Sequence, residues 1–283
     1  RPVGLGPMHE AYPGRVIDVG IAEAEAVASA AGMAYQGAHP VVALYATFLN
    51  RGFDQLLMDV ALHRAGVTFV LDRAGVTGAD GASHNGVWDI AMCSMIPGLR
   101  LAAPRDEETL RARLREALDV DDAPTVIRYR KGSLPEPMPA LRSVGGVDIL
   151  FDEVVADSSA RVLIVGTGAC APDAIEAARR LAADGVSVTV ADPQWMIPIS
   201  SDLATLAGDY DCVVSVEDGI VQGGFGWSLR ESVADTGVPV RCLGVPQGFP
   251  EHGDRAEMIA QFGYDADGIE RAARELVERI SNR

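Results

Sequence analysis

The chain has 283 residues, 48% of them hydrophobic and 23% charged, a composition typical of a globular protein large enough for about two domains. Its formal net charge of −16 argues against nucleic acid as a partner, because a phosphate backbone requires a broad surface of clustered Lys and Arg. Any anionic substrate must therefore meet local cations.

The cysteines and the hydropathy of the chain indicate its surroundings. The four cysteines lie far apart and form no CxxC pair, which gives no sign of a zinc site or a disulfide framework and fits a reducing cytoplasm. No run of about eighteen apolar residues and no basic-then-apolar leader occurs, so we expect neither a membrane span nor a signal peptide. The opening residues 1–5 contain no initiator Met, which predicts a fragment or a processed subunit.

The first part of the chain alternates predicted strands and helices. Residues 15–19 are predicted as a strand and residues 21–35 as an Ala-rich helix, so that Glu23 lies at the junction between them. Further strands are predicted at 40–45, 67–72, 99–102 and 125–129, helices at 53–64 and 106–119, and a glycine-bearing loop at 75–86. This alternation indicates βαβ units and an α/β fold with a mostly parallel, doubly wound sheet.

A second α/β domain is predicted after a linker. Residues 133–139 carry three prolines, which disfavour both helix and central strand. Strands are then predicted at 161–166, 186–191, 212–217 and 240–243, with helices at 173–184, 225–235, 256–262 and 267–280. We therefore predict a first domain over residues 1–132, a proline-rich linker and connecting segment over 133–159, and a second domain over 160–283.

Unusual side chains gather after the strands of the first domain. Glu23 follows the first predicted strand, residues 45–51 follow the second, and residues 72–84 follow the third. The carboxyl ends of parallel strands share one edge of a sheet, so these side chains can converge on one site. Taken singly, each has an ordinary structural explanation, such as Phe48 in a core or Arg51 on the surface.

Taken together, these residues resemble the 1-deoxy-D-xylulose-5-phosphate synthase family, thiamine-diphosphate enzymes of the transketolase superfamily. The resemblance rests on Gly20-Ile21-Ala22-Glu23, on Tyr45 to Arg51, on Asp72-Arg73-Ala74-Gly75 with Gly78-Ala79-Asp80-Gly81 and Ser83-His84, on Ala103-Pro104-Arg105-Asp106, on Arg128-Tyr129, on Asp192 to Trp195, on Val216-Glu217-Asp218 and on Gly223-Gly224. It covers nearly the whole chain and implies a pyrimidine-binding domain followed by a transketolase C-terminal domain.

The resemblance implies a role for each matching residue. Glu23 would hydrogen-bond the N1′ atom of the cofactor's aminopyrimidine and control its protonation, while the cofactor carries the carbanion chemistry. Phe48 would stack on the pyrimidine ring, with Tyr45 beside it. The implied reaction is decarboxylation of pyruvate and condensation with glyceraldehyde 3-phosphate.

The same resemblance implies the substrate-binding residues. Arg51 and Arg73 would hold the phosphorylated acceptor, a task suited to the guanidinium group. Asp80 and His84 match the family's active-site loop, where His84 would contact the bound substrate or move a proton. Lys131 matches a basic residue that contacts phosphate. No metal ligand is predicted in this chain.

The sequence also departs from the family. Ala24-Glu25 stand where the family usually has Gln-His, Arg130 stands where a proline is usual, and Lys131 where an arginine is common. The Gly-Asp-Gly motif with which the family's amino-terminal domain binds diphosphate and Mg²⁺ does not occur. The resemblance therefore implies an amino-terminal half or partner subunit, without which the chain is inactive, in a homodimer or heterotetramer.

Three alternatives remain open from the sequence. Residues 165–171 follow a strand, open a helix and fit G-x-G-x-x-A, with Asp192 after the next strand, a pattern that predicts dinucleotide binding and an oxidoreductase. The changes at Ala24 and Glu25 suggest a non-catalytic partner subunit. They also fit a subunit of a two-component ketol or acyl transferase of specialised metabolism.

Overall fold

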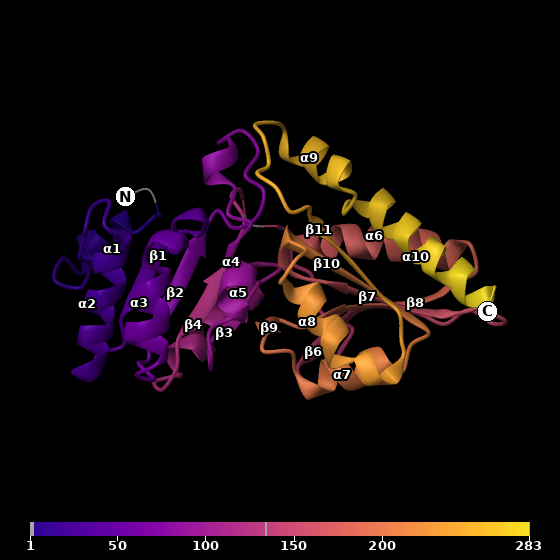
Figure 1. Cartoon of the computed structure of the whole chain (residues 1–283), viewed down its shortest axis with the longest axis horizontal. Coiled ribbons are helices and arrows are strands. Elements are labelled where there is room, and N and C mark those ends of the chain that lie inside the picture. Colours follow the sequence, from indigo (N-terminus) through magenta and orange to yellow (C-terminus); the bar gives the residue numbers. More distant parts are fainter. Residues whose placement is uncertain (1–2, 134, 283) are drawn as a thin grey trace.

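The computed structural model describes residues 3–133 and 135–282. Two β-sheets, each with helices on both faces, lie side by side along the long axis of the molecule, with the N-terminus and the C-terminus at opposite ends (Figure 1). This confirms the prediction of two α/β domains with mostly parallel sheets. Leu134 in the predicted linker, and the predicted domain limits at residues 1 and 283, lie outside the described residues.

The first sheet has the strand order β1-β2-β4-β3-β9. Its strands are β1 (Val41–Tyr45), β2 (Thr68–Asp72), β3 (Arg100–Ala102), β4 (Thr125–Arg128) and β9 (Trp195–Ile197). Strands β1 to β4 are parallel to one another, while β9 pairs antiparallel with β3. Because β9 comes from the second half of the chain, it joins the two domains through main-chain hydrogen bonds.

Helices cover both faces of the first sheet. They are α1 (Gly6–Ala11), α2 (Glu23–Tyr35), η1 (Ala46–Gly52), α3 (Phe53–Gln55), η2 (Leu56–Ala61), η3 (Ala82–His84), α4 (Asp89–Ser94) and α5 (Glu107–Leu118). Alternate residues of β4 face opposite cores: Val126 packs with the residues of α2 and α4, and Ile127 packs against α5. Helix α5 begins at a capping box in which the Asp106 carboxylate accepts a hydrogen bond from the Thr109 amide.

The predicted strand at residues 15–19 is wrong. These residues are mostly exposed and adopt no strand, and β1 forms the outer edge of the sheet in their absence. An apolar run becomes a strand only when a neighbouring strand satisfies its backbone groups. Glu23 is consequently the first residue of α2, preceded by an irregular segment and not by a strand.

The second sheet has the strand order β11-β10-β7-β8-β6-β5. Its strands are β5 (Arg142–Val144), β6 (Val147–Glu153), β7 (Arg161–Gly166), β8 (Ser187–Asp192), β10 (Cys212–Ile220) and β11 (Val240–Val245). The four later strands are parallel, whereas β6 pairs antiparallel with both β8 and β5. Residues 142–153, which the sequence places in the connecting segment, thus form a hairpin of this sheet.

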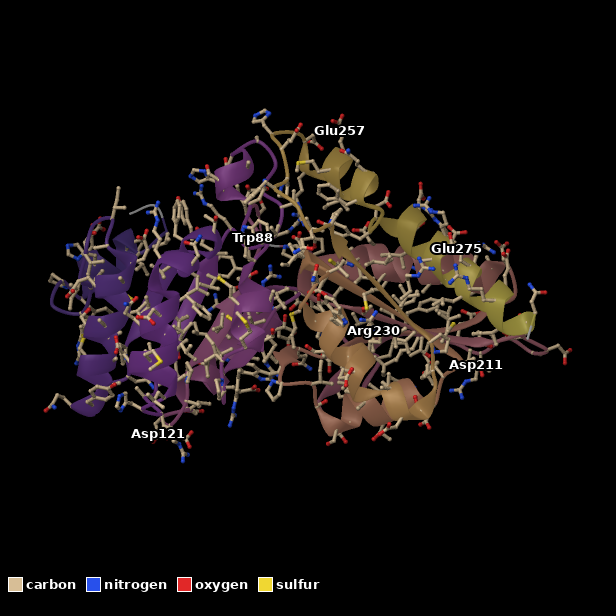
Figure 2. All side chains as sticks on the ribbon, in the orientation of Figure 1. Trp88, Asp121, Asp211, Arg230, Glu257 and Glu275 are labelled. Carbon is tan, nitrogen blue, oxygen red and sulfur yellow. The ribbon has the colours of Figure 1, made fainter. Side chains whose placement is uncertain are left out.

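The helices of the second domain also form two layers. They are η4 (Gly168–Cys170), α6 (Ala171–Ala183), α7 (Ser201–Gly208), α8 (Phe225–Ser232), η5 (Ala234–Thr236), α9 (Arg255–Phe262) and α10 (Ala266–Ser281). Val162 and Ile164 of β7 face α6 and α10, whereas Leu163 and Val165 face α7, α8 and a core that is continuous with that of the first domain. Glu257 lies on the outer side of α9 (Figure 2), whereas Glu275 of α10 pairs with Arg241 of β11.

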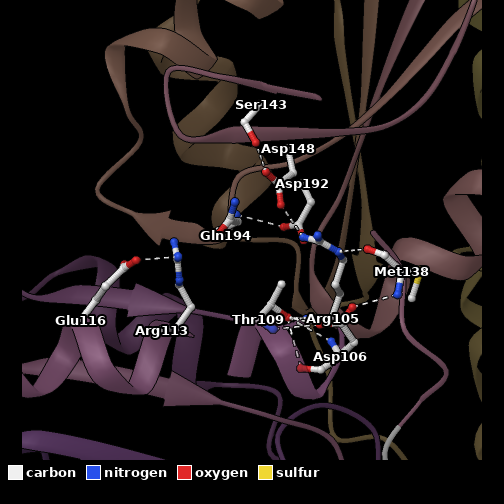
Figure 3. Close-up of polar contacts among 10 residues, drawn as sticks. All are labelled: Arg105, Asp106, Thr109, Arg113, Glu116, Met138, Ser143, Asp148, Asp192 and Gln194. Atoms are coloured by element: carbon white, nitrogen blue, oxygen red, sulfur yellow. Dashed lines mark hydrogen bonds and ion pairs between the residues drawn. The ribbon is translucent and has the colours of Figure 1, made fainter. Parts of the chain in front are cut away.

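Buried charges connect the two domains. Arg105 follows β3, and its Nη1 atom lies 2.8 Å from Asp148 and 2.9 Å from Asp192 on the second sheet (Figure 3). Its Nε donates to the carbonyl oxygen of Met138, 2.9 Å away, which also fixes the connecting segment. Trp88 lies where the domains meet (Figure 2), with its ring 5.5 Å from that of Phe249.

Within the described ranges, no helix combines the length and hydropathy needed to cross a bilayer.

Candidate active site

The loops that follow β1, β2 and β4 lie at one edge of the first sheet. Tyr45 at the end of β1 is paired in register with Asp72 at the end of β2, and Arg128 ends the adjacent strand β4. The polar residues after each strand therefore start from neighbouring positions, as the parallel order requires.

Glu23, Phe48 and Arg51 form one part of the site. The Arg51 guanidinium lies 4.7 Å from the centroid of the Phe48 ring, and its Nη1 lies 3.5 Å from a carboxylate oxygen of Glu23. The Glu23 side chain is 12% exposed and that of Arg51 is 52% exposed. The carboxylate is thus largely shielded from water, and its partner is a half-exposed cation.

Tyr45, Arg73, Asp80 and Lys131 form a second part. The Arg73 guanidinium lies 4.2 Å from the centre of the Tyr45 ring and 3.8 Å from Asp80, and the Lys131 ammonium donates to Asp80 at 2.7 Å. The Lys131 hydrogen bond, together with the nearby charges of Lys131 and Arg73, keeps the pKa of Asp80 below its usual value. One carboxylate therefore holds two cations beside each other.

Phe48 contacts both His84 and Tyr45, and its pairing with Tyr45 joins the two parts. The His84 ring lies 5.6 Å from that of Phe48 in an edge-on arrangement, and its Nδ1 is 2.9 Å from the Ser83 hydroxyl. Tyr45 stacks on Phe48, with the ring centroids 5.9 Å apart. The predicted site residues Glu23, Tyr45, Phe48, Arg51, Arg73, Asp80, His84 and Lys131 are therefore all linked by direct contacts. Their roles stay predictions.

A cavity of about 690 Å³ adjoins this cluster between the two domains. The first domain lines it with Arg73 and Lys131, among others, and the second domain with Asp173 and Asp218. Neither carboxylate was predicted as a site residue, although Asp218 belongs to the segment Val216-Glu217-Asp218 that resembles the family. The described residues contain no group of three or more His, Cys, Asp or Glu side chains able to hold a metal ion.

The interpretation of residues 165–171 as a dinucleotide-binding turn is wrong. A Cβ atom on Gly168 would lie 2.9 Å from the carbonyl oxygen and the Cβ of Ala103, so this glycine permits close packing between the domains. Asp192, the expected ribose ligand, is buried and bound to Arg105. The space and the carboxylate that a dinucleotide would need are both taken by the protein itself.

The fold and the residues gathered at the edge of the first sheet define the class of protein. It is a transketolase-type pyrimidine-binding α/β domain followed by a transketolase-type C-terminal domain. Residues 3–137 match the family model described as the transketolase pyrimidine-binding domain, and residues 153–269 match the transketolase C-terminal domain. The chain belongs to the transketolase superfamily.

Individual relatives refine this assignment. The chain is 54% identical over 285 residues to 1-deoxy-D-xylulose-5-phosphate synthase 2 of Kitasatospora griseola, a match that covers 99% of the chain and 45% of the relative. It is 50% identical over 273 residues to 1-deoxy-D-xylulose-5-phosphate synthase of Corynebacterium glutamicum, covering 95% of the chain and 43% of the relative. The chain is therefore similar to the carboxy-terminal part of these synthases and spans less than half of their length.

A solved structure also relates the chain to transketolases. The chain superposes on a split-gene transketolase, described as an inactive β4 tetramer, with a TM-score of 0.80 and 26% identity. The match covers 95% of this chain and 86% of the other. The tandem arrangement of the two domains is thus shared with a transketolase.

Proposed function

We propose that this chain supplies the pyrimidine- and substrate-binding residues of a 1-deoxy-D-xylulose-5-phosphate synthase. The activity is the condensation of pyruvate with glyceraldehyde 3-phosphate, with release of CO₂. The observation that carries the proposal is the contact of Glu23, Phe48, Arg51, Arg73, Asp80, His84 and Lys131 in one cluster at the sheet edge. The identity to synthases over nearly the whole chain supports it.

The residues fit the aminopyrimidine of thiamine diphosphate. Arg51 offers a planar N–H donor group that contacts the Glu23 carboxylate and the face of the Phe48 ring together. An aminopyrimidine is also flat and carries nitrogen donors, so it can make the same two contacts once Arg51 moves away. The exposure of Arg51 makes this movement inexpensive, and it frees the guanidinium for the substrate.

Bound thiamine diphosphate supplies the stabilised carbanion that the reaction needs. Glu23 would hydrogen-bond the pyrimidine nitrogen from a position that is 12% exposed to water. Phe48 would stack on the pyrimidine, and Tyr45 supports the Phe48 ring from its stacked position. These residues orient the cofactor and control its protonation.

The cations at Asp80 suit a phosphorylated acceptor. Arg73 and Lys131 present N–H donors side by side, and such groups bind phosphate well. The Asp80 Oδ2 oxygen is buried 3.8 Å from Arg73 Nη1 and, among the described residues, has no hydrogen-bond donor, so Asp80 holds Arg73 in place by charge. His84 stands beside Phe48, where it can contact the bound substrate or move a proton.

We propose that catalysis also requires an amino-terminal diphosphate- and Mg²⁺-binding half, in a cytoplasmic homodimer or heterotetramer. The chain spans 45% of a related synthase and contains no Gly-Asp-Gly motif. The test is reconstitution: the chain, with and without a synthase amino-terminal domain, is supplied with thiamine diphosphate, Mg²⁺, pyruvate and glyceraldehyde 3-phosphate. Product is expected only from the mixture, and turnover by the chain alone would contradict this requirement.

A second candidate is the subunit of a two-component ketol or acyl transferase. It is favoured by Ala24-Glu25, although the exposed position of Glu25 keeps this added charge out of the contacts of Glu23. Assays of the reconstituted protein with a series of 2-oxo acids and aldehydes separate the two. A preference for pyruvate and glyceraldehyde 3-phosphate supports the synthase, and a preference for another pair supports the transferase.

A further inference from the structure

The loop after β2 carries Asp80 and His84 but is held largely by the second domain. It is the glycine-bearing loop predicted at residues 75–86. In Figure 1 it stands beside the segment that leads into α9. The contacts across this boundary come from Asp218 at the end of β10, from Arg255 at the start of α9 and from the segment before α9.

Asp218 binds the backbone of the loop. Its Oδ1 accepts the Val76 amide at 3.0 Å and the Tyr264 hydroxyl at 2.9 Å, and its side chain is 2% exposed. Burial alone would raise the pKa of Asp218, but the Arg255 and Arg128 guanidinium groups outweigh burial and hold the pKa below its usual value. The carboxylate therefore stays charged and keeps accepting from the loop.

Arg255 completes the contact. Its Nη2 lies 2.7 Å from Asp218 Oδ2, and its Nη1 donates to the carbonyl oxygen of Val76. The amide and the carbonyl group of Val76 are thus both hydrogen-bonded, the amide to Asp218 and the carbonyl oxygen to Arg255. The planar fork of arginine allows these two directed bonds, which a lysine ammonium reproduces less well.

Two glycines allow the loop to approach so closely. Gly75 has a φ of +81°, and a Cβ there would lie 2.0 Å from Asp218 Oδ2. Gly78 has a φ of +69°, and a Cβ there would lie 2.8 Å from the carbonyl oxygen of Gly253. Both positions need glycine for conformation and for space.

The far end of the loop is fixed in the same way. Asn85 is fully buried, accepts the Thr77 amide at 2.8 Å and donates to the carbonyl oxygen of Pro250 at 3.3 Å. Asp80 and His84 therefore lie between two anchors supplied by the second domain. Their distances from Lys131 and Phe48 depend on both anchors.

We propose that Arg255, with Asp218, is a positioning residue that holds the glycine-bearing loop in place for the substrate. The effect on substrate rests on the proposed function, because that function assigns Asp80 and His84 to the substrate. The clamp itself rests on the contacts above. Through it, two residues of the second domain hold a loop of the first domain.

Hydrogen exchange of the full chain tests the clamp. Arg255→Gln and the milder Tyr264→Phe and Arg255→Lys are compared with Arg241→Gln, a control that removes an exposed ion pair with Glu275 in the same domain. Peptides over residues 76–85 should exchange at least about fivefold faster in Arg255→Gln, with smaller increases in the milder variants. Peptides of α7 in every variant should exchange at the wild-type rate. All peptides of Arg241→Gln should do so as well.

Kinetics of the reconstituted enzyme test the consequence. Arg255→Gln should raise the KM for the aldehyde acceptor about tenfold while kcat falls less, and Arg255→Lys should recover part of the loss. Unchanged exchange over residues 76–85, or exchange that rises equally throughout the chain, overturns the clamp. A faster-exchanging loop with an unchanged acceptor KM overturns the positioning role. If the wild-type mixture makes no product, the proposed function fails, and the exchange data still decide whether Arg255 holds the loop.

Discussion

Replacing Arg105 by alanine should destabilise the chain strongly and in a pH-dependent way. Arg105 is the cation that faces both Asp148 and Asp192, and its side chain is only 4% exposed (Figure 3). Its removal leaves two carboxylates buried without their partner. Breaking a buried ion pair by removing one member typically costs about 3–5 kcal/mol, because the remaining charge keeps its desolvation penalty. We expect a loss in this range near pH 8.

The loss should shrink in acid. Burial already raises the pKa of Asp192 although Arg105 lowers it, so without the cation the folded-state pKa must rise further above the unfolded value of about 3.9. A carboxyl whose pKa is raised on folding contributes stability below its unfolded pKa and loses that contribution as the pH rises through its folded pKa. The difference between wild type and Arg105→Ala should therefore be smaller at pH 5 than at pH 8.

Urea unfolding followed by tryptophan fluorescence measures this difference at both pH values. The control is Arg142→Ala, which removes a half-exposed partner of Asp152 from the same hairpin and should cost less than about 1 kcal/mol. A loss for Arg105→Ala no larger than that of the control, or equal losses at pH 5 and pH 8, would refute the reasoning.

Three further perturbations have distinct expected outcomes. Burial raises the pKa of Glu217 to about 7, so the wild type should lose about 2 kcal/mol more unfolding free energy than Glu217→Gln between pH 5.5 and 8.5, as urea titrations will show. Glu23→Ala should reduce turnover of the reconstituted enzyme at least about 100-fold with little change in Tm, because it removes the carboxylate that would control the protonation of the cofactor. Unchanged turnover would instead indicate a non-catalytic subunit. Gly75→Ala should lower Tm more than Gly81→Ala, because both have a φ of +81° but a Cβ on Gly81 meets open space; equal shifts would contradict the tight contact with Asp218.

The longer elements of the fold could be predicted because their signals are local. Strand β7 is a continuous apolar run buried on both faces, and helix α10 carries the 3.6-residue periodicity that its packing uses. The hairpin of β5 and β6 and the short strand β9 were not predicted, since each depends on partners distant in the sequence. The error at residues 15–19 has the same cause: the apolar pattern was present, and the partner was not.

The candidate site shows the same division. Phe48 and Arg73 could be found from motifs that follow strand ends, which a parallel sheet brings together, and Glu23 from the motif at the start of α2. Arg255 could not, because more than a hundred residues separate it from Val76 and only the domain packing brings them into contact. The position of Arg51 against Glu23 and Phe48 was also beyond the sequence, since a motif fixes a residue's place in the chain and not its rotamer.

The buried charges between the domains explain how one interface can serve both stability and the site. Arg105 holds the side of the cavity next to β8, and Arg255 holds the glycine-bearing loop. Apolar contacts of similar area would tolerate small shifts between the domains, whereas hydrogen-bonded charges accept few geometries. We therefore expect variants of Arg105 to change domain stability first, and variants of Arg255 to change acceptor binding first. The cavity between them responds to both, because each domain supplies part of its wall.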